Sequence, residues 1–342
     1  MNAQIFAGTP PAVLLEGVHK WYPKTGNYRD ILRFWRRQKI EALRGVDLTV
    51  RSGSAFGLLG TNGAGKTTLL KLLAGLLLPN SGKVFIDGVD ATQNFGRIRH
   101  RLTYVSSDER THYWRLTGRQ NLEFYGRMYH VPARRLKSRV NELLELVGIS
   151  AMADEMVIKY SSGMRQRLAL ARGLIAEPRI MLLDEPTRSL DPVGARHMWA
   201  FIKDELIGKQ GVTVLIATHD MEEATFLCEE VAVVHQGQVK VSATPDQLRD
   251  RLGGEHLVKL KLLKLPEDVL LEVNSMPGVT NLVIHSPNGR PYFDLDVGLD
   301  DPETVLPGVV EHLTNKGCGV VEAVRHRAGL GDVLAAIAEG RL

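Results

Sequence analysis

Blocks of apolar and polar positions divide the first 250 residues into alternating strands and helices. Residues 44–60 predict a strand, a turn and a second, buried strand that ends in glycine. Apolar positions at helical spacing predict a helix over 66–77. Continuous apolar runs at 179–185 and 213–219 predict two more buried strands, each followed by a polar turn. Strands that alternate with helices favour an α/β fold with a largely parallel sheet and helices on both faces.

The pattern changes twice along the chain. Between about 92 and 177 it is mostly helical. Beyond about residue 250, six segments follow in the order β-α-β-β-α-β, which predicts a small ferredoxin-like α+β domain, and a further helix follows at 330–342. We therefore expect two domains, residues 1–250 and 255–342, with the boundary near Gly253-Gly254.

Composition narrows the class of protein. The chain has 342 residues, of which 44% are hydrophobic and 24% charged, as is typical of a packed protein of two or three domains. A net charge of +4 does not indicate nucleic-acid binding. The two cysteines, Cys228 and Cys318, are far apart in sequence, which predicts a reducing compartment with neither a disulfide framework nor a zinc site.

The hydropathy pattern also bears on the membrane. The N-terminus has no basic start followed by a long apolar core, so it does not resemble a secretory signal. The apolar stretch 69–79 is interrupted by Lys71 and is too short to span a bilayer. We expect a soluble chain that acts at a membrane only through a partner or from the membrane surface.

The segment GTNGAGKTT, residues 60–68, contains the pattern G-x-x-x-x-G-K-S/T between an apolar strand and a helix, where it predicts a phosphate-binding loop. Glycines let backbone N–H groups converge on phosphate oxygens, Lys66 would neutralise the β- and γ-phosphates, and Thr67 would offer a hydroxyl to Mg²⁺. The alternative is a glycine-rich turn with an exposed lysine, which the flanking strand and helix disfavour. The predicted nucleotide-binding residues of this segment are Gly60, Asn62, Gly63, Ala64, Gly65, Lys66, Thr67 and Thr68.

Polar residues end two of the predicted buried strands. Asp184 and Glu185 follow the apolar run at 180–183. Asp184 is placed to hold the Mg²⁺ shell, largely through water, and Glu185 to polarise an attacking water. His219 ends the run LIATH, and because parallel strand ends converge on the ligand crevice, we expect it to contact the γ-phosphate rather than only to terminate the strand.

Two further segments complete the candidate site. Tyr22 precedes the first core strand and would stack on adenine, with Trp21 as the alternative, although either ring could instead pack on the sheet. In KYSSGMRQRLALAR, residues 159–172, Ser161 or Ser162 is a candidate N-cap of an amphipathic helix, and a helix start of this kind attracts anions.

Together these motifs resemble the nucleotide-binding subunit of an ATP-binding cassette (ABC) transporter. They follow that family's order and approximate spacing across residues 12–245. They are the phosphate loop 60–68, the signature-like YSSGMRQR at 160–167, the apolar run ending in Asp184 and Glu185, SLD at 189–191, and His219.

The resemblance implies a fold and an assembly. The fold would be a RecA-like P-loop NTPase core with an inserted α-helical subdomain at about 95–175. The assembly would be a head-to-tail dimer in which each ATP lies between one chain's phosphate loop and the other chain's signature. By matching positions, Ser161 and Gly163 would touch the γ-phosphate held opposite, and Asp191 would lie at the dimer seam.

Two positions depart from the family pattern. The signature has Ser162 and Met164 where glycine and glutamine are common, and variants of this form resemble exporter-type members, especially those paired with type-2 ABC export permeases. Ser107 stands where the family has a glutamine that contacts Mg²⁺ and the attacking water. Serine is shorter, so we expect Ser107 to shape the loop rather than to bind Mg²⁺ directly, with Asp108, Glu109 or a bridging water as substitutes.

Two segments are candidates for contact with a membrane protein or with lipid. Residues 112–129 resemble the exporter region that receives the permease, and His112, Tyr113 and Trp114 would form either that socket or subdomain core. The insertion 23–40 carries six cations and one acid, and an amphipathic helix there suits the cytoplasmic membrane surface or the permease, the alternative being a solvated helix.

We therefore expect an ATP- and Mg²⁺-dependent ATPase subunit that forms a dimer, most simply a homodimer, and drives a separate transmembrane permease. Its place would be the cytoplasmic side of the cell membrane, peripheral through the permease, with no nucleic-acid partner. The cargo of such an exporter would be a glycolipid or polysaccharide, a lipid or a drug-like compound. The alternative is a soluble ABC ATPase that acts on nucleic acid or ribosomes, which the single cassette and the absence of heptads disfavour.

Overall fold

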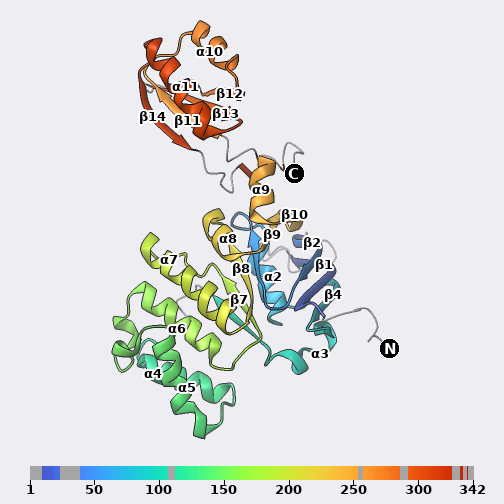
Figure 1. Cartoon of the computed structure of the whole chain (residues 1–342). Coiled ribbons are helices and arrows are strands. Elements are labelled where there is room, and N and C mark those ends of the chain that lie inside the picture. The colour runs from blue at the N-terminus through green and yellow to red at the C-terminus, as the bar shows by residue number, and fades with distance from the viewer. Residues whose placement is uncertain are drawn as a thin grey trace, which may run out of the picture. The chain divides into compact units, whose positions relative to one another are not determined.

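The computed structural model describes residues 10–23, 39–106, 112–252, 257–285, 292–325, 332–333 and 337 (Figure 1). The chain divides into two compact units, Met1–Pro245 and Asp246–Leu342. This division lies a few residues before the boundary predicted from sequence, because the helix α9 (Pro245–Leu252) begins at the end of the first unit.

A six-stranded sheet forms the centre of the first unit. Its strand order is β10-β9-β3-β8-β7-β6, and all neighbours are parallel except the hairpin of β9 and β10. The central strands β3, β8 and β7 are buried along their whole length, as expected for a parallel sheet covered on both faces. The strands are β3 (Ala55–Leu59), β6 (Leu102–Ser106), β7 (Ile180–Asp184), β8 (Thr213–Thr218), β9 (Glu230–His235) and β10 (Gln238–Ala243).

A second, antiparallel sheet and one helix cover one face of this core. The helix α2 (Lys66–Leu73) contributes Leu69, Leu70 and Leu73 to an apolar cluster that includes side chains of both sheets. The second sheet has the order β2-β1-β4-β5. Its strands are β1 (Val13–Pro23), β2 (Lys39–Val50), β4 (Ser81–Ile86) and β5 (Val89–Asp90), and the helix α3 (Ala91–Ile98) follows it.

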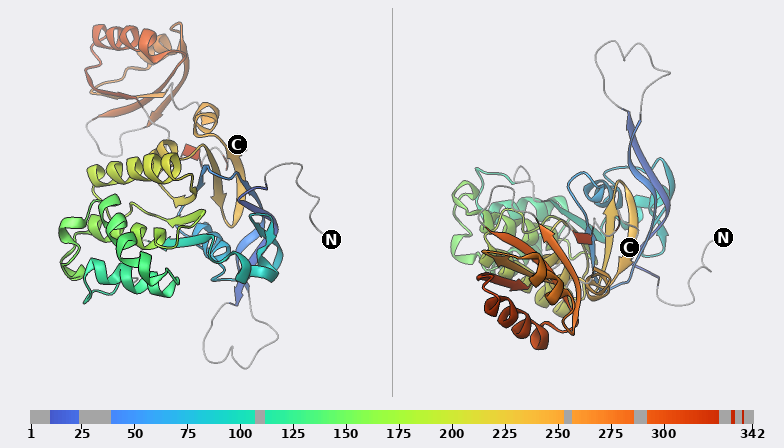
Figure 2. Two further views of the ribbon diagram at one scale, coloured as in Figure 1. Left: turned by 60° about the horizontal axis from the view of Figure 1, so that its bottom comes forward. Right: turned by 90° about the horizontal axis from the view of Figure 1, so that it is seen from above.

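The helical region lies to one side of the core strands, between β6 and β7 in sequence (Figure 2). Thr117 starts its first helix with a capping box that it shares with Gln120. The expected start of this region at about residue 95 is wrong, because β6 lies beyond that point and pairs with β7. The helices are α4 (Gly118–Met128), α5 (Ala133–Leu146), the short turns η3 (Ser150–Met152) and η4 (Val157–Lys159), and α6 (Ser162–Leu174).

Two helices follow the strands whose ends carry the predicted chemistry. After β7, α7 (Pro192–Ala200) is capped by Asp191 and continues as the π-helical segment η5 (Phe201–Lys209). After β8, α8 (Met221–Leu227) is capped by Asp220. In each case the aspartate side chain accepts hydrogen bonds from two N–H groups of the first turn, which fixes where the helix begins.

The second unit has an antiparallel sheet with the strand order β12-β13-β11-β14. Apolar side chains of both helices pack with the sheet in one core, so the helices cover the same face. The elements follow the order β-α-β-β-α-β, the arrangement of a split β-α-β fold. They are β11 (Leu257–Leu262), α10 (Glu267–Asn274), β12 (Val279–His285), β13 (Phe293–Leu299), α11 (Pro302–Asn315) and β14 (Val320–Arg325). Most of the helix predicted at 330–342 lies outside the described residues.

None of the helices in the described ranges is both long and apolar enough to cross a bilayer.

Candidate functional site

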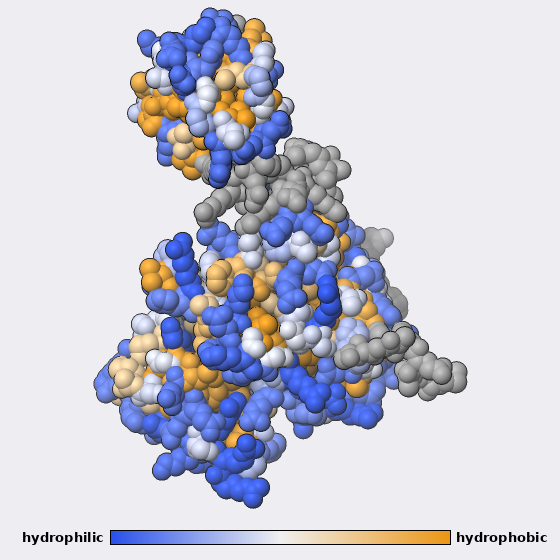
Figure 3. Space-filling view, in the orientation of Figure 1, coloured by the Kyte–Doolittle hydropathy of each residue, from blue (hydrophilic) through white to orange (hydrophobic). Residues whose placement is uncertain are grey.

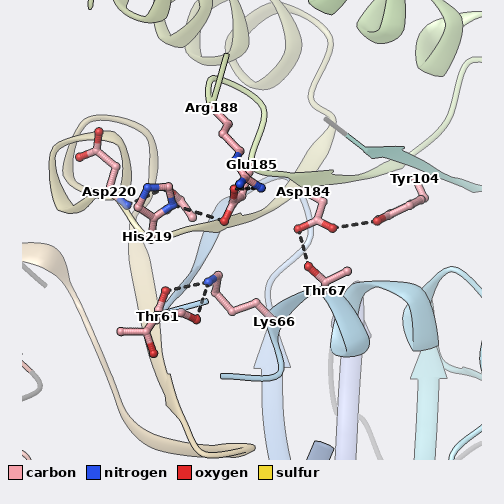
Figure 4. A network of polar contacts seen from close by, with 11 residues as sticks. Thr61, Lys66, Thr67, Tyr104, Asp184, Glu185, Arg188, His219 and Asp220 are labelled. Atoms are coloured by element: carbon pink, nitrogen blue, oxygen red, sulfur yellow. Dashed lines mark hydrogen bonds and ion pairs between the residues drawn. The ribbon is translucent and has the colours of Figure 1, made fainter. Parts of the chain in front are cut away.

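The predicted polar residues meet at the carboxyl ends of β3, β7 and β8. Leu59, the last residue of β3, lies beside Thr218 of β8, and Asp184 of β7 lies beside Ala217 of the same strand. Lys66, Asp184, Glu185 and His219 therefore surround one edge of the sheet (Figure 4). A parallel sheet forms its ligand crevice at this edge.

Two glycines allow the loop after β3 to turn closely against the sheet. A Cβ atom on Gly60 would lie 2.3 Å from the carbonyl oxygen of Val234. Gly65 has φ +114°, and a Cβ there would lie 2.7 Å from the carbonyl oxygen of Ala42. Gly65 also caps α2 without any side-chain hydrogen bond, so the first N–H groups of that helix remain available to an anion.

The remaining loop residues differ in exposure. Asn62 and Gly63 are exposed, and Asn62 lines a cavity of about 420 Å³ beside the site. Ala64 is buried, and its carbonyl accepts a hydrogen bond from the N–H of Gly237 at 2.8 Å, which anchors the loop. Thr68 is half-buried in the first turn of α2.

Lys66 is almost completely buried, with 5% of its surface exposed. Its Nζ donates to the carbonyl oxygens of Gly60 at 2.6 Å and Thr61 at 3.0 Å (Figure 4). Burial lowers the pKa of Lys66, and the nearby carboxylates of Glu185 and Asp184 oppose that change. A buried cation beside the first N–H groups of α2 fits an anionic ligand such as a phosphate chain.

Asp184 is held from two sides. The hydroxyl of Thr67 donates to its Oδ1 at 3.0 Å, and the hydroxyl of Tyr104 donates to its Oδ2 at 2.8 Å (Figure 4). A hydroxyl and a carboxylate are hard oxygen donors of the kind that Mg²⁺ prefers. Within the described residues, no three His, Cys, Asp or Glu side chains could hold a metal together. The pair of Thr67 and Asp184 thus fits an ion whose other ligands are phosphate oxygens and waters.

Glu185 points to the other side of the strand end. Its backbone has φ +50°, a strained conformation for a residue other than glycine, and its N–H donates to the carbonyl of Ala217 at 2.8 Å. Only 11% of its side chain is exposed. Its Oε1 lies 3.3 Å from Nδ1 of His219, and its buried Oε2 lies 3.3 Å from a guanidinium nitrogen of Arg188 in an ion pair but accepts no hydrogen bond from the described residues (Figure 4). A carboxylate held in this way could take a proton from water.

Tyr22 and Ser161, two further predicted site residues, lie outside this cluster. Tyr22 lies in β1 opposite Ile40 of β2, with Nζ of Lys20 5.3 Å from its ring centroid. Ser161, not Ser162, caps α6, and its Oγ accepts from the N–H of Met164 at 3.2 Å.

The signature segment lies near the Asp191 loop of the same chain. A Cβ on Gly163 would lie 3.7 Å from Leu190, the residue before Asp191. Among the described residues, neither Ser161 nor Gly163 hydrogen-bonds to Lys66, Asp184 or Glu185. The chain therefore presents two separate parts of the predicted site.

Some predictions can be placed only partly. Ser107 and residues 24–38 of the basic insertion lie outside the described residues. Of the predicted socket, His112 is buried, Trp114 is half-buried with Arg165 5.4 Å from its ring centroid, and Tyr113 is exposed and packs edge-on against Phe124 at 4.8 Å. The three aromatic residues are thus divided between core and surface.

Sequence reasoning misses several members of the cluster. Tyr104 reaches Asp184 because β6 pairs with β7, with Tyr104 opposite Leu182, and a short strand inside a helical pattern hides this pairing. Arg188 pairs with Glu185, and Glu223 accepts a hydrogen bond from Thr187, two residues after Glu185. Both follow predicted strand ends, where sequence alone does not distinguish a charged residue of the site from one in a solvated turn.

Comparison with known proteins identifies the family of this chain. The family model described as "ABC transporter" matches residues 43–188. The daunorubicin resistance ATP-binding protein DrrA3 of Streptomyces coeruleorubidus is 41% identical over 300 residues, which cover 86% of this chain and 90% of that protein. The chain belongs to the ABC transporter family.

Solved ABC structures match the fold as well. cbiO1 of Clostridium perfringens, described as part of the ABC transporter complex cbiONQ, matches with a TM-score of 0.61 and 26% identity over 78% of this chain and 95% of that one. A dimeric ATP-binding cassette in a post-hydrolysis state with ADP and phosphate matches with a TM-score of 0.59 and 27% identity over 68% of this chain and 98% of that one.

These likenesses confirm the predicted RecA-like P-loop core and the predicted enzyme class. This ABC subunit binds ATP and is an ATPase coupled to transport. Of these solved structures, the post-hydrolysis cassette is a dimer, and cbiO1 is part of an ABC transporter complex.

Proposed function

We propose that this ABC ATPase powers an export permease for drug-like cargo, with the cluster around Glu185 as its hydrolytic centre. The observation that carries the proposal is the joint placement of Lys66, Asp184, Glu185 and His219 at one edge of the parallel sheet. The exporter assignment rests on the signature variant at 160–167 and on the likeness to a daunorubicin resistance protein.

The phosphate loop and α2 bind the triphosphate. The loop glycines and the first N–H groups of α2 surround the β- and γ-phosphates, and Lys66 supplies a buried positive charge. Thr67 and Asp184 hold Mg²⁺, which neutralises charge on the phosphate oxygens when it is bound. Tyr22 supports the adenine by stacking from the end of β1.

Glu185 is the general base and His219 contacts the γ-phosphate. The carboxylate of Glu185 accepts a proton from the attacking water as the oxygen approaches phosphorus. His219 directly follows β8, and its Nδ1 lies 3.3 Å from Oε1 of Glu185. It is therefore next to both the base and the sheet edge where the γ-phosphate would bind. This arrangement orients the water and stabilises charge that develops on the phosphate.

A second copy of the chain completes each site. Ser161 is an exposed helix cap that hydrogen-bonds to no member of its own chain's Lys66 cluster, so it is available to an ATP held opposite. Gly163 lies in the same first turn, and Asp191 caps the helix that starts beside it. We assign Ser161 and Gly163 to the partner's γ-phosphate and Asp191 to the dimer seam.

The permease docks on apolar side chains of the helical region. Four exposed side chains lie before, within and at the end of α4, namely Tyr113, Phe124, Met128 and Tyr129. The rings of Tyr113, Phe124 and Tyr125 pack together. Figure 3 shows apolar patches among hydrophilic ones over the helical region, at the lower left. Exposed aromatic and methionine side chains are enriched at protein interfaces. The basic insertion 23–40 adds contact with the cytoplasmic membrane surface.

The test of the proposal is Glu185→Gln in the chain co-purified with its permease. The amide cannot take the proton, so turnover should fall by about 100-fold or more while ATP binding persists and an ATP-bound dimer accumulates. Glu222→Gln, an acid-to-amide change at an exposed residue of the same cavity, is the matched control. Phosphate release by Glu185→Gln at the wild-type rate would remove Glu185 from the role of base.

A further inference from the structure

One buried carboxylate joins the two chain segments that follow β7 and β8. The first segment runs from Glu185 through Thr187 to Asp191, where α7 begins. The second is Thr218-His219-Asp220, where α8 begins. Glu223, in the first turn of α8, lies between them with 1% of its surface exposed.

Glu223 accepts hydrogen bonds from two places in the segment that follows β7. Its Oε1 accepts from the hydroxyl of Thr187 at 2.6 Å and from the indole N–H of Trp199, in α7, at 3.0 Å. Glu223 itself lies three residues after Asp220, in the helix that follows His219. One side chain of the His219 segment thus contacts the loop after Glu185 and the helix after Asp191.

A carboxylate at such a position lowers stability unless it is paired. Burial raises the pKa of Glu223, the polar side chains of Thr187, Thr218 and Trp199 oppose the rise, and the charge of Asp220 adds to it. Across the described part of the chain, no cation lies within ion-pair distance of Glu223. An apolar side chain would fill this space with less desolvation, so packing alone does not explain a carboxylate here.

A second set of contacts binds the same two helices together. The rings of Trp199 and Phe226 lie 5.8 Å apart, and Nζ of Lys203 donates to the carbonyl of Phe226 at 2.9 Å. Glu223 therefore joins the first turn of α8 to the last turn of α7, at Trp199, and to Thr187 in the loop before α7. Phe226, further along α8, adds contacts to Trp199 and to Lys203 of η5.

We infer that Glu223 is a positioning residue for ATP hydrolysis, which holds the His219 segment and the segment 185–191 in fixed relative positions. The inference rests on the proposed roles of Glu185, His219 and Asp191. Contact of His219 with a γ-phosphate then fixes Glu185 for proton abstraction and sets Asp191 against the second copy of the chain. Without Glu223 the loop at Thr187 would lose its hydrogen bond to α8, the two segments would be held less firmly, and bound ATP would meet the reactive arrangement less often.

The experiment measures kcat and KM for ATP in the full chain co-purified with its permease. Glu223→Ala should lower kcat by about 10- to 100-fold, the loss expected when reacting groups are misplaced, and leave KM for ATP within about threefold. Glu223→Gln keeps an oxygen acceptor for Thr187 and Trp199, so it should retain at least half of the wild-type kcat. Thr187→Val removes one of the two hydrogen bonds to Glu223 and should lower kcat by a few-fold.

Controls separate positioning from stability. Leu227→Ala creates a buried cavity one turn further along α8, so it should lower Tm without changing the ratio of kcat to KM by more than about twofold. The double variant Glu223→Ala/Thr187→Val should be no slower than Glu223→Ala alone, because both changes remove the same contact. Since an alanine at a buried site also affects folding, Thr187→Val and the rescue by Glu223→Gln test the inference independently.

The outcomes distinguish this inference from the proposed function. Equal kcat losses in Glu223→Ala and Leu227→Ala, or wild-type kcat in Thr187→Val, would overturn the positioning role. A parallel loss of ATP binding in Glu223→Ala would also overturn it. Turnover that survives Glu185→Gln would instead refute the proposed base, whatever the Glu223 variants show.

Discussion

The two units of the chain place their charged side chains in opposite ways. In the first unit, β3, β7 and β8 are buried throughout, and the charged residues gather beyond their carboxyl ends. In the second unit, Lys259 and Lys261 of β11 lie beside Asp296 and Asp294 of β13, in the middle of the sheet. Lys261 also forms an exposed ion pair with Glu322 at 2.6 Å.

Strand direction explains this difference. Parallel strands bring all their carboxyl ends to one edge, where Lys66, Asp184 and Glu185 are partly removed from water and interact strongly. The antiparallel sheet of the second unit has both helices on one face, so charges on its other face, such as Lys259 and the pair of Lys261 and Glu322, stay at least partly exposed to water and contribute little. The first unit can therefore perform chemistry, and we propose that the second stabilises or regulates the dimer.

The largest effect is expected at Ser161, the cap of α6. In its own chain this residue forms no hydrogen bond with the described residues Lys66, Asp184 and Glu185. Ser161→Arg places a long cation where the partner's γ-phosphate is proposed to bind, so turnover should fall by at least about 100-fold. A single chain that has not dimerised should still bind ATP, because its phosphate loop is unchanged. ATPase assays and nucleotide binding measure the two effects, with Ser138→Arg on an exposed position of α5 as the control. Loss of ATP binding by the single chain would show that Ser161 serves its own chain's site.

The next effect tests the pair that is proposed to hold Mg²⁺. Tyr104→Phe removes the hydroxyl that fixes Oδ2 of Asp184 and leaves the ring in place. The Mg²⁺ concentration for half-maximal ATPase activity should rise by about tenfold, the usual cost of losing a partner of a metal ligand. Tyr129→Phe, at an exposed tyrosine of the helical region, should leave the Mg²⁺ dependence unchanged. An unchanged Mg²⁺ requirement in Tyr104→Phe would separate Asp184 from metal binding.

A smaller effect concerns the buried carboxylate of the first unit. The pKa of Glu223 is raised above its ordinary value of 4.5. Its contribution to the free energy of unfolding is therefore fully present below about pH 4.5 and is lost as pH rises through the folded-state value. Glu223→Gln removes this dependence, so its Tm relative to wild type should increase from pH 5 to pH 8. Thermal unfolding at both values measures it, and an identical difference at the two values would contradict the raised pKa.

The smallest effect is expected in the second unit. The hydrogen bond from Lys316 and the nearby His312 lower the pKa of Glu272, which is exposed. Its contribution is present above its ordinary pKa of 4.5 and is lost as pH falls through the lower folded-state value. Glu272→Gln should leave both Tm at pH 7 and ATPase activity indistinguishable from wild type. A clear loss of Tm or of ATPase activity would show that exposed charges of this unit contribute to stability or to turnover.

The parts of the site that lie within short segments could be predicted from the sequence. The phosphate loop, the carboxylates after β7 and the histidine after β8 are each encoded by an apolar run followed by a few defined residues. The cap at Ser161 was predicted as one of two adjacent serines, because capping depends on the first helical turn alone. The strand β6 could not be predicted from its own segment, because five residues inside a helical pattern have no distinctive period.

Contacts between distant segments were decided by the tertiary structure alone. Tyr104 reaches Asp184 across two paired strands, Arg188 pairs with Glu185, and Glu223 of α8 bonds to the loop before α7 and to α7 itself. Local pattern specifies which residues share a face or end an element. It does not specify which elements become neighbours, and those neighbours decide whether a carboxylate is hydrated at the surface or buried and held beside the reacting groups.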